Sequence, residues 1–335
     1  MTIKDVAQIA GVAHTTVSRV IHNDHRISDP TRQRVLKAMA SVDYQPNLIA
    51  RGLVRNRTQV IALINPEVAP FTLSIIRGAA ETCSKHNYAM MLFPTNTWIM
   101  EALSFEWIAK NWLVDGIVVH NLIYHKTVPP EILEMQSRMS PFVFVNKFLR
   151  ETQVNAVGVD NYHAVGLAVQ HLVELGHRRI GAFYGDLTSV DGFERYDGFK
   201  VALKKAGLPS DESWSACGMW HDAAAHEEMR KMLDRPNPPT ALFCADDMMG
   251  IGAMKAIREK GLRVPQDISI VGYDDIETTS YIDVPLTTIR PPLAEVGTRS
   301  VDLLMAILQD PKRPPQQIAL QAELVVRNSA ARPRA

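Results

Sequence analysis

From Thr58 onward, short runs rich in Val, Ile and Leu alternate with stretches whose apolar residues recur at helical spacing. The runs that we expect to form strands are 60–65, 88–93, 116–120, 141–146, 156–160, 179–185, 213–218, 241–246, 268–273 and 286–290. Helical patterns lie between most of them, at 73–86, 100–113, 162–175, 193–206, 221–234 and 247–260. Apolar strands between amphipathic helices are typical of parallel sheets covered on both faces. Ten such strands exceed what one sheet usually holds, so we expect two side-by-side α/β lobes.

The first 57 residues have a different pattern, which predicts three short helices. Apolar spacing indicates one helix at 3–10, ended by Gly11, and a second at about 14–21. The pair Asp29-Pro30 favours the start of a third helix, because proline is preorganised for the first helical position. A helix, a tight glycine turn, a second helix and a packing helix form the helix-turn-helix arrangement.

Charge is distributed unevenly along the chain, although the formal net charge is zero. Residues 1–57 carry a net charge of +5, and the remaining residues carry −5. A basic head on an acidic body predicts that the head meets a polyanion, and the alternative is an ordinary solvated surface. The segment 46–57 carries three arginines and is either a short helix, marginal in water by itself, or a basic linker.

Cysteine usage and hydropathy argue against a secreted or membrane protein. Only Cys83, Cys217 and Cys244 occur, without a C-x-x-C motif, so we expect neither a disulfide framework nor a zinc module. The longest apolar runs, such as 60–64 and 142–145, hold about 4–5 residues, far below the roughly 18 that span a bilayer. The opening residues lack the apolar core of a signal peptide. We therefore expect a cytoplasmic protein.

Several stretches, in order along the chain, resemble the LacI family of bacterial repressors. In the head and the segment after it they are TIKDVA (2–7), TVSRV (16–20), YQPN (44–47) and ARGL (50–53). In the body they include LGHRRIG (175–181), RYDGF (195–199), PTA (239–241), DISIVGYDD (267–275) and PLTTI (285–289). Because these motifs span essentially the whole chain, the sequence is identified as a member of that family.

The resemblance implies a three-part organisation. It comprises a helix-turn-helix domain at 1–45, a hinge helix or linker at 46–57, and an effector-binding and dimerisation core at 58–335. The core is expected to hold two Rossmann-like subdomains, as in periplasmic sugar-binding proteins. They are an N-subdomain of about 58–158 and 290–320 and a C-subdomain of about 159–289 and 321–329, with crossings near Gly158, Ile289 and Leu320. No apolar heptad follows Asn328, so a homodimer is expected.

The resemblance also implies which residues contact a palindromic DNA operator. The residues expected on the major-groove face of the recognition helix are His14, Thr15, Thr16, Ser18 and Arg19. The residues expected at phosphates or in the hinge are Arg26, Thr31, Asn47, Ala50, Arg51, Leu53 and Arg55. Arg19 can pair bidentately with guanine, and a surface salt bridge is its alternative. Leu53 matches a leucine that unstacks a base step in the minor groove, and a contact between two hinge helices is its alternative.

An effector site between the subdomains is the third implication. The residues expected to line it are Phe71, Thr72, Asn146, Asp191, Arg195, Trp220, Asp246 and Asp274. Arginine and carboxylates bind hydroxyl groups, and an aromatic ring covers the C–H face of a sugar. The structural alternatives are a buried Arg195–Asp274 pair and a Trp220 that belongs to the core. Abundant polar groups favour a small sugar or polyol over a nucleobase, and we expect this sugar to release a repressor of carbohydrate catabolism from its operator.

Two other classes of protein fit the sequence less well. A transport binding protein shares a two-lobed core but needs export and leaves residues 1–57 unexplained. An α/β enzyme needs a catalytic or phosphate-binding motif, and none is found. The run 250–255 holds only part of a dinucleotide-binding motif, and the run 226–230 lacks the second histidine of a zinc protease. No cofactor and no metal are therefore expected.

Overall fold

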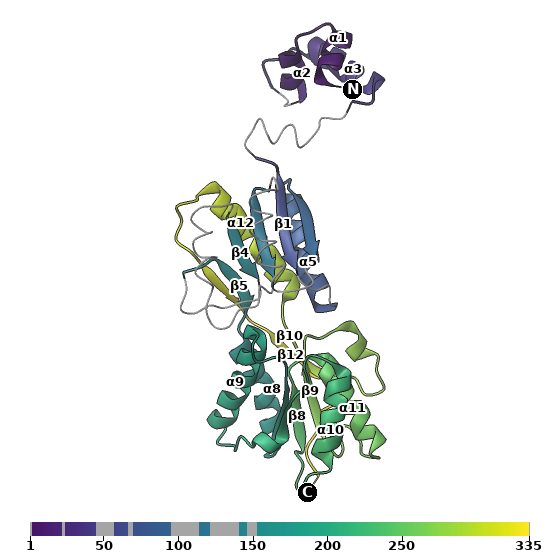
Figure 1. Cartoon of the computed structure of the whole chain (residues 1–335), viewed down its shortest axis with the longest axis vertical. Helices are drawn as coiled ribbons and strands as arrows, with labels where there is room; N and C mark the ends of the chain where they lie inside the picture. Colours follow the sequence, from purple (N-terminus) through teal and green to yellow (C-terminus); the bar gives the residue numbers. More distant parts are fainter. Residues whose placement is uncertain are drawn as a thin grey trace. The chain divides into compact units, whose positions relative to one another are not determined.

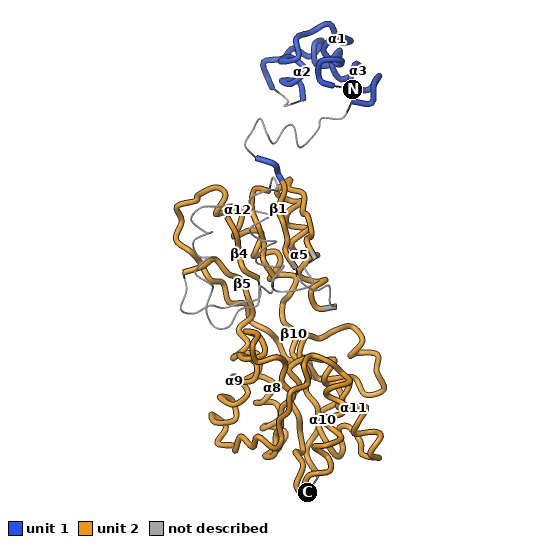
Figure 2. The backbone as a smooth tube through the Cα atoms, viewed as in Figure 1, with its two compact units in different colours: residues 1–59 blue, residues 60–335 orange. Residues whose placement is uncertain are grey.

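The computed structural model describes residues 2–21, 24–44, 57–65, 70–94, 114–120, 141–145 and 153–334. The chain forms two compact units, residues 1–59 and residues 60–335 (Figure 2). Among the described helices, none combines the length and the apolar character that crossing a bilayer requires.

The first unit is a three-helix bundle. Its helices are α1 (Ile3–Ala10), α2 (His14–Ile21) and α3 (Asp29–Ser41). Each helix contributes one fully buried valine to a small shared core, namely Val6, Val17 and Val35. Gly11 ends α1 in the left-handed conformation, with a φ of 59°, which glycine adopts at little cost. These helices confirm the predicted helix-turn-helix arrangement, although Leu36 on α3 is 44% exposed rather than packed.

The described residues of the second unit form two six-stranded sheets (Figure 1). In the first sheet the strand order is β11-β5-β4-β3-β1-β2, and all neighbouring strands are parallel. Its strands are β1 (Val60–Asn65), β2 (Ala89–Pro94), β3 (Gly116–His120), β4 (Phe142–Val145), β5 (Ala156–Val159) and β11 (Gln317–Leu320). Two helices that pack on this sheet and on each other are α5 (Pro70–Lys85) and α12 (Leu293–Gln309).

The second sheet has the order β12-β10-β9-β8-β6-β7, and only its edge strand β12 is antiparallel to its neighbour. Its strands are β6 (Ile180–Tyr184), β7 (Ser215–Cys217), β8 (Ala241–Cys244), β9 (Ser269–Tyr273), β10 (Thr287–Arg290) and β12 (Glu323–Val325). Helices α8 (Asn161–Glu174) and α9 (Val190–Lys205) lie on one side of it, and α10 (Asp222–Leu233) and α11 (Asp247–Glu259) lie on the other (Figure 1). Two short 3₁₀ helices are η1 (Glu212–Trp214) and η2 (Glu277–Ser280).

The chain passes between the two sheets three times. It leaves the first sheet after β5 and enters α8, returns after β10 into α12, and leaves again between β11 and β12. The first and third passages touch, since the amide of Asp160 donates to the carbonyl oxygen of Leu320 at 3.0 Å. Two mostly parallel sheets flanked by helices confirm the predicted fold class. The proposed subdomain boundaries stay a prediction.

Three elements near the end of the chain are absent from the sequence-based prediction, namely α12, β11 and β12. Both strands lie at sheet edges and are only partly buried, so they lack the continuous apolar run that marks the central strands. The helix predicted at 100–113 and most of the predicted hinge at 46–57 lie outside the described residues.

Helices α5 and α12 approach each other through two glycines. A Cβ atom on Gly78 would collide with the carbonyl oxygen of Ala294, and one on Gly297 would collide with that of Ile75. Because the colliding atoms belong to the opposite backbone, neither helix can yield by turning a side chain. The two glycines therefore fix how closely these helices pack.

We predict that Gly78→Ala lowers the free energy of unfolding of the core by about 1–3 kcal/mol through overpacking. Gly166→Ala in α8 is the matched control, because nothing lies within 4 Å of its added Cβ. That control should gain about 0.5–1 kcal/mol from helix propensity. Urea unfolding of both variants measures the difference, and equal effects would contradict the close approach.

Candidate functional site

Helix α2 presents a polar face and buries an apolar one. Val17 and Val20 point into the core of the head, while His14, Thr15 and Arg19 are exposed. The predicted contacts Thr16 and Ser18 are partly exposed. This helix therefore offers polar side chains at its first turn, where a recognition helix contacts base edges.

Two arginines of the head differ in their surroundings. Among the residues that the structure describes, the Arg19 guanidinium forms no ion pair, so the salt bridge that was its alternative role is absent there. Arg26 instead holds Asp24 with two nitrogens, Nε at 3.0 Å and Nη2 at 2.8 Å, and this contact lowers the pKa of Asp24. Thr31 lies in the first turn of α3 and accepts a hydrogen bond from Ser28 Oγ at 3.0 Å.

Six predicted site residues lie outside the described residues, and their roles stay predictions. They are Asn47, Ala50, Arg51, Leu53, Arg55 and Asn146.

In the second sheet, predicted effector residues follow the carboxyl ends of parallel strands. Asp246 comes two residues after β8, and Asp274 comes directly after β9. Trp220 lies three residues after β7, and α9, which follows β6, supplies Asp191 and Arg195. Because the carboxyl ends of parallel strands meet at one edge of a sheet, this topology gathers the side chains where open α/β sheets bind ligands.

Arg195 lies at the centre of this cluster and is only 7% exposed. Its Nη1 donates to the carbonyl oxygen of Ala245 at 2.6 Å and lies 3.5 Å from Asp274 Oδ1. The guanidinium carbon is 3.6 Å from the centre of the Tyr273 ring and 5.6 Å from that of Trp220. Its Nε also donates to Asn161 Oδ1 at 3.4 Å, so Arg195 is held by a backbone carbonyl, a side-chain amide, a carboxylate and two aromatic faces.

The cluster contains residues that the sequence-based prediction missed. Asn161 donates from Nδ2 to Asp191 at 3.1 Å and to Glu194 at 2.9 Å, and its Oδ1 accepts from the Tyr273 hydroxyl at 2.9 Å. Its place shortly after the expected strand 156–160 is the sequence signal that indicates Asn161, because ligands bind at strand ends in such sheets. Tyr273 was counted as a strand residue because it lies within an apolar run.

Burial and charge act against each other on the ionisable groups of this cluster. Burial alone disfavours the guanidinium, but the negative charges of Asp274, Asp191 and Asp246 raise the pKa of Arg195, so it remains a cation. Burial raises the pKa of Asp274 to about 7, although Arg195 opposes this shift. Burial also raises the pKa of Asp246, whose Oδ1 caps α11 by accepting from the amide of Met249 at 2.7 Å.

Trp220 reaches this cluster through an unusual backbone and a glycine. Its φ of 63° and that of Met219, 50°, lie in the left-handed region. The indole lies against Gly185, directly after β6, where an added Cβ would collide with the ring. This close approach and the nearby Arg195 favour a ring fixed at the site over a residue of the ordinary core.

Phe71 and Thr72 begin α5 on the first sheet. The Phe71 ring lies 6.2 Å from the ring of His120 at the end of β3, and Thr72 is buried. Their role as a further wall of the effector site stays a prediction.

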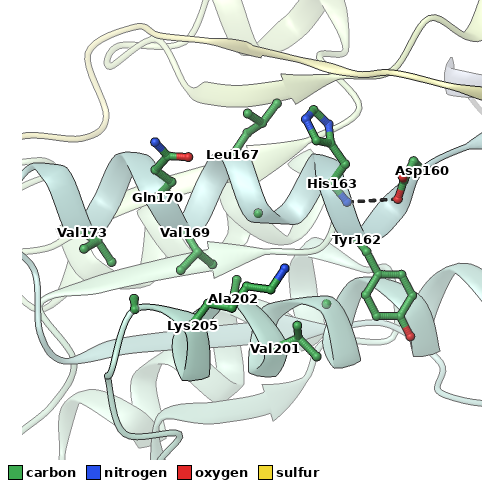
Figure 3. A pocket seen from close by; sticks show the side chains of 13 residues that line it. Asp160, Tyr162, His163, Leu167, Val169, Gln170, Val173, Val201, Ala202 and Lys205 are labelled. Carbon is green, nitrogen blue, oxygen red and sulfur yellow. Dashed lines mark hydrogen bonds between the residues drawn. The ribbon is translucent and has the colours of Figure 1, made fainter.

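A separate groove of about 570 Å³ lies between α8 and α9 (Figure 3). Val169, Val173 and Val201 line it, and Lys205 extends over it from α9. None of its lining residues belongs to the Arg195 cluster. Among the described residues, no group of His, Cys, Asp and Glu side chains is arranged to hold a metal ion.

We predict that the Asp274 carboxyl makes the core less stable as pH rises. Because its pKa is about 7 in the folded chain and about 3.9 in the unfolded one, only the folded chain keeps the proton between these values. Its contribution to stability is therefore full below pH about 4 and is lost as pH rises towards 7, at up to about 1.4 kcal/mol per pH unit. Asp274→Asn, measured by urea unfolding from pH 4 to 8, should remove this part of the slope. A wild-type protein that gains stability over the variant as pH rises would show that Arg195 keeps Asp274 ionised.

Two family profiles and several full-length relatives match the chain. The profile of bacterial regulatory proteins of the lacI family matches residues 2–47, and that of the periplasmic binding protein-like domain matches residues 169–330. The HTH-type transcriptional repressor CytR of Escherichia coli (strain K12) is 34% identical over 330 residues, which cover 98% of this chain and 96% of the relative. The repressor PurR of Pasteurella multocida (strain Pm70) is 34% identical over 331 residues, which cover 98% of each chain.

Solved structures agree with these relatives. The lac repressor dimer bound to operator and the anti-inducer ONPF is similar with a TM-score of 0.90 at 28% identity, covering 99% of each chain. The complex of the transcriptional regulator CelR with cellobiose is similar with a TM-score of 0.75 at 31% identity, covering 98% of this chain and 100% of that one. A LacI family regulator from Enterococcus faecium with bound ribose is similar with a TM-score of 0.68 at 27% identity. The match covers 82% of this chain and 99% of that one. The chain therefore belongs to the lacI family of bacterial regulatory proteins and is a DNA-binding transcriptional repressor rather than an enzyme.

Proposed function

We propose that this repressor controls genes of carbohydrate catabolism and that a small neutral sugar, bound beside Arg195, releases it from its operator. The observation that carries the proposal is the buried cluster in which Arg195, Asp274, Asp246 and Trp220 meet at one sheet edge. Carboxylates and a guanidinium bind vicinal hydroxyl groups, and an indole covers an apolar sugar face. Related regulators hold cellobiose and ribose, which supports this class of ligand.

The charge of the cluster favours a neutral sugar over a phosphorylated one. Arg195 is surrounded by the carboxyl groups of Asp191, Glu194, Asp246 and Asp274. A phosphate group here would meet more negative than positive charge, at the cost of desolvation in a buried site. A sugar hydroxyl, in contrast, donates to a carboxylate and accepts from the guanidinium.

We place the DNA contacts on the exposed face of α2 and in the predicted hinge. His14, Thr15 and Arg19 are the side chains proposed to contact bases, with Thr31 and Arg26 near phosphates. The protein is proposed to act in the cytoplasm as a homodimer, since a palindromic operator requires two heads. Coupling between a sugar and the operator is then a free energy of about 1–3 kcal/mol per site, typical of allosteric linkage.

We predict that a neutral sugar stabilises the core and that Asp274→Asn abolishes this effect. At one hundred times its Kd a ligand adds about 2.7 kcal/mol to the free energy of unfolding. The variant should still fold, because the amide resembles the neutral carboxyl, which the raised pKa of Asp274 makes accessible near neutral pH. A thermal-shift screen of sugars, sugar phosphates and nucleosides measures the effect. Asp234→Asn is the matched control, since Asp234 forms an exposed ion pair with Lys260. Stabilisation by nucleosides or sugar phosphates alone would contradict the proposal.

We predict different effects for two arginines of the head, measured on an operator selected from random duplexes. Arg19→Ala should cost about 1–3 kcal/mol on the selected operator and much less on unrelated DNA, because a base contact is lost. Arg26→Ala should weaken binding to both and reduce the salt dependence by about one counterion, as a phosphate contact does. If Arg19→Ala lowered the affinity for the selected operator and for unrelated DNA equally, this result would contradict a base contact by Arg19.

A further inference from the structure

We propose that Asp275 is a positioning residue that ties the turn bearing Asp274 to the segments that join the two sheets. This inference rests on the proposed function, because it concerns how occupation of the sugar site is transmitted through the core. Contacts between the described residues carry it, and none of them involves the ligand itself.

The turn at Asp274 and Asp275 is strained. Their φ angles are 105° and 51°, in a region that favours glycine, and such residues cost on the order of 1–3 kcal/mol each. Conformations of this kind persist only where surrounding contacts over-determine them. Here two hydrogen bonds from backbone amides hold the turn in this conformation. The amide of Asp274 donates to the carbonyl oxygen of Ile289 at 2.9 Å, and the amide of Ile276 donates to Asp247 Oδ2 at 2.9 Å.

The Asp275 carboxylate is held at both oxygens. Its Oδ2 accepts from Arg290 Nε at 2.5 Å, and its Oδ1 accepts from Arg327 Nη2 at 2.6 Å. The Asp275 side chain is only 8% exposed and that of Arg327 is 17% exposed, so this ion pair lies largely out of water, whereas the Arg290 side chain is 48% exposed. Arg327 is fixed in turn, because its Nη1 donates to the carbonyl oxygen of Leu286 at 2.8 Å.

Arg290 lies where the chain passes between the sheets, whereas Arg327 follows β12. Arg290 is the last residue of β10, just before the chain returns to the first sheet through α12. Its Nη1 donates at 2.8 Å to Glu323, the first residue of β12, directly after the chain has left β11. Arg290 and Glu323 are also register partners in the antiparallel pair of β10 and β12. One carboxylate thus connects the Asp274 turn to two of the three passages.

The remaining passage reaches the same cluster by another route. Asn161, which begins α8 after β5, bonds Tyr273, Asp191 and Glu194 around Arg195. A ligand that moves Asp274 therefore acts on groups anchored to every passage. Such contiguous contacts are a physical route for coupling, which a direct measurement of coupling must establish.

The first test needs no ligand. In the full chain, Asp274→Asn and Glu323→Gln are combined in a double-mutant cycle followed by urea unfolding. These two side chains are linked through Asp275 and Arg290. The unfolding equilibrium constant of the double variant should therefore differ at least about threefold from the value expected if the fold-changes of the two single variants simply multiplied. This departure should vanish when Asp275→Asn is present, persist with Arg290→Lys, and vanish with Arg290→Gln. Additive effects in the chain that keeps Asp275 would overturn the proposal.

Glu227→Gln is the matched control, because Glu227 forms an exposed ion pair with Arg230 on α10. Combined with Asp274→Asn, it should give additive effects. Coupling of similar size in this control would mean that the cycle reports a general loss of stability, and it would overturn the assignment to Asp275.

A second test uses D-ribose and cellobiose as probes of operator affinity. If either sugar weakens operator binding by the wild-type chain, Asp275→Asn should lose most of this change in operator affinity when each chain is saturated with the sugar. An unchanged response in this variant would overturn the proposal. If neither these nor other sugars affect operator binding, the proposed function fails, whereas the ligand-free cycle still decides whether Asp275 links Asp274 to Glu323.

Discussion

The core of this repressor depends on a guanidinium buried among carboxyl groups. Removing a charge such as that of Arg195 from water costs several kcal/mol, and only close partners offset this cost. Those partners come from separate places in the chain, namely Tyr273 and Asp274 at the end of β9, the carbonyl of Ala245 after β8, and Asn161 after β5. The requirement to compensate one buried cation therefore holds the carboxyl ends of several strands in a fixed arrangement.

The same requirement explains why this arrangement suits a binding site. The hydrogen bond to Ala245 is short at 2.6 Å, whereas the contacts of Arg195 with Asn161 and Asp274 are longer, at 3.4 and 3.5 Å. Burial raises the pKa of Asp274 to about 7, so this carboxyl is poised between its two protonation states near neutral pH. A ligand with hydroxyl groups supplies donors and acceptors that complete these partial interactions. A neutral polar ligand therefore adds hydrogen bonds to the side chains of this site.

Much of the fold was predictable from sequence, and the failures have physical causes. Central strands such as β3 and β4 are buried along their whole length, so they appear as continuous apolar runs. Edge strands β11 and β12 are partly exposed and carry no such run. The candidate site was predictable where a family motif names the residue, as at Arg195 and Asp274. Asn161 and Asp275 act through contacts between segments distant in the sequence, which only the folded chain brings together.

The central claim is that the sugar site and the operator site influence each other through one chain. Linkage requires that a sugar which weakens operator binding also binds more weakly to the operator complex, by the same factor. Isothermal titration of the most stabilising sugar into free protein, and into protein saturated with operator, measures this factor directly. The account predicts a sugar affinity about 5–150-fold lower in the complex. Equal sugar affinities in the two titrations would contradict it.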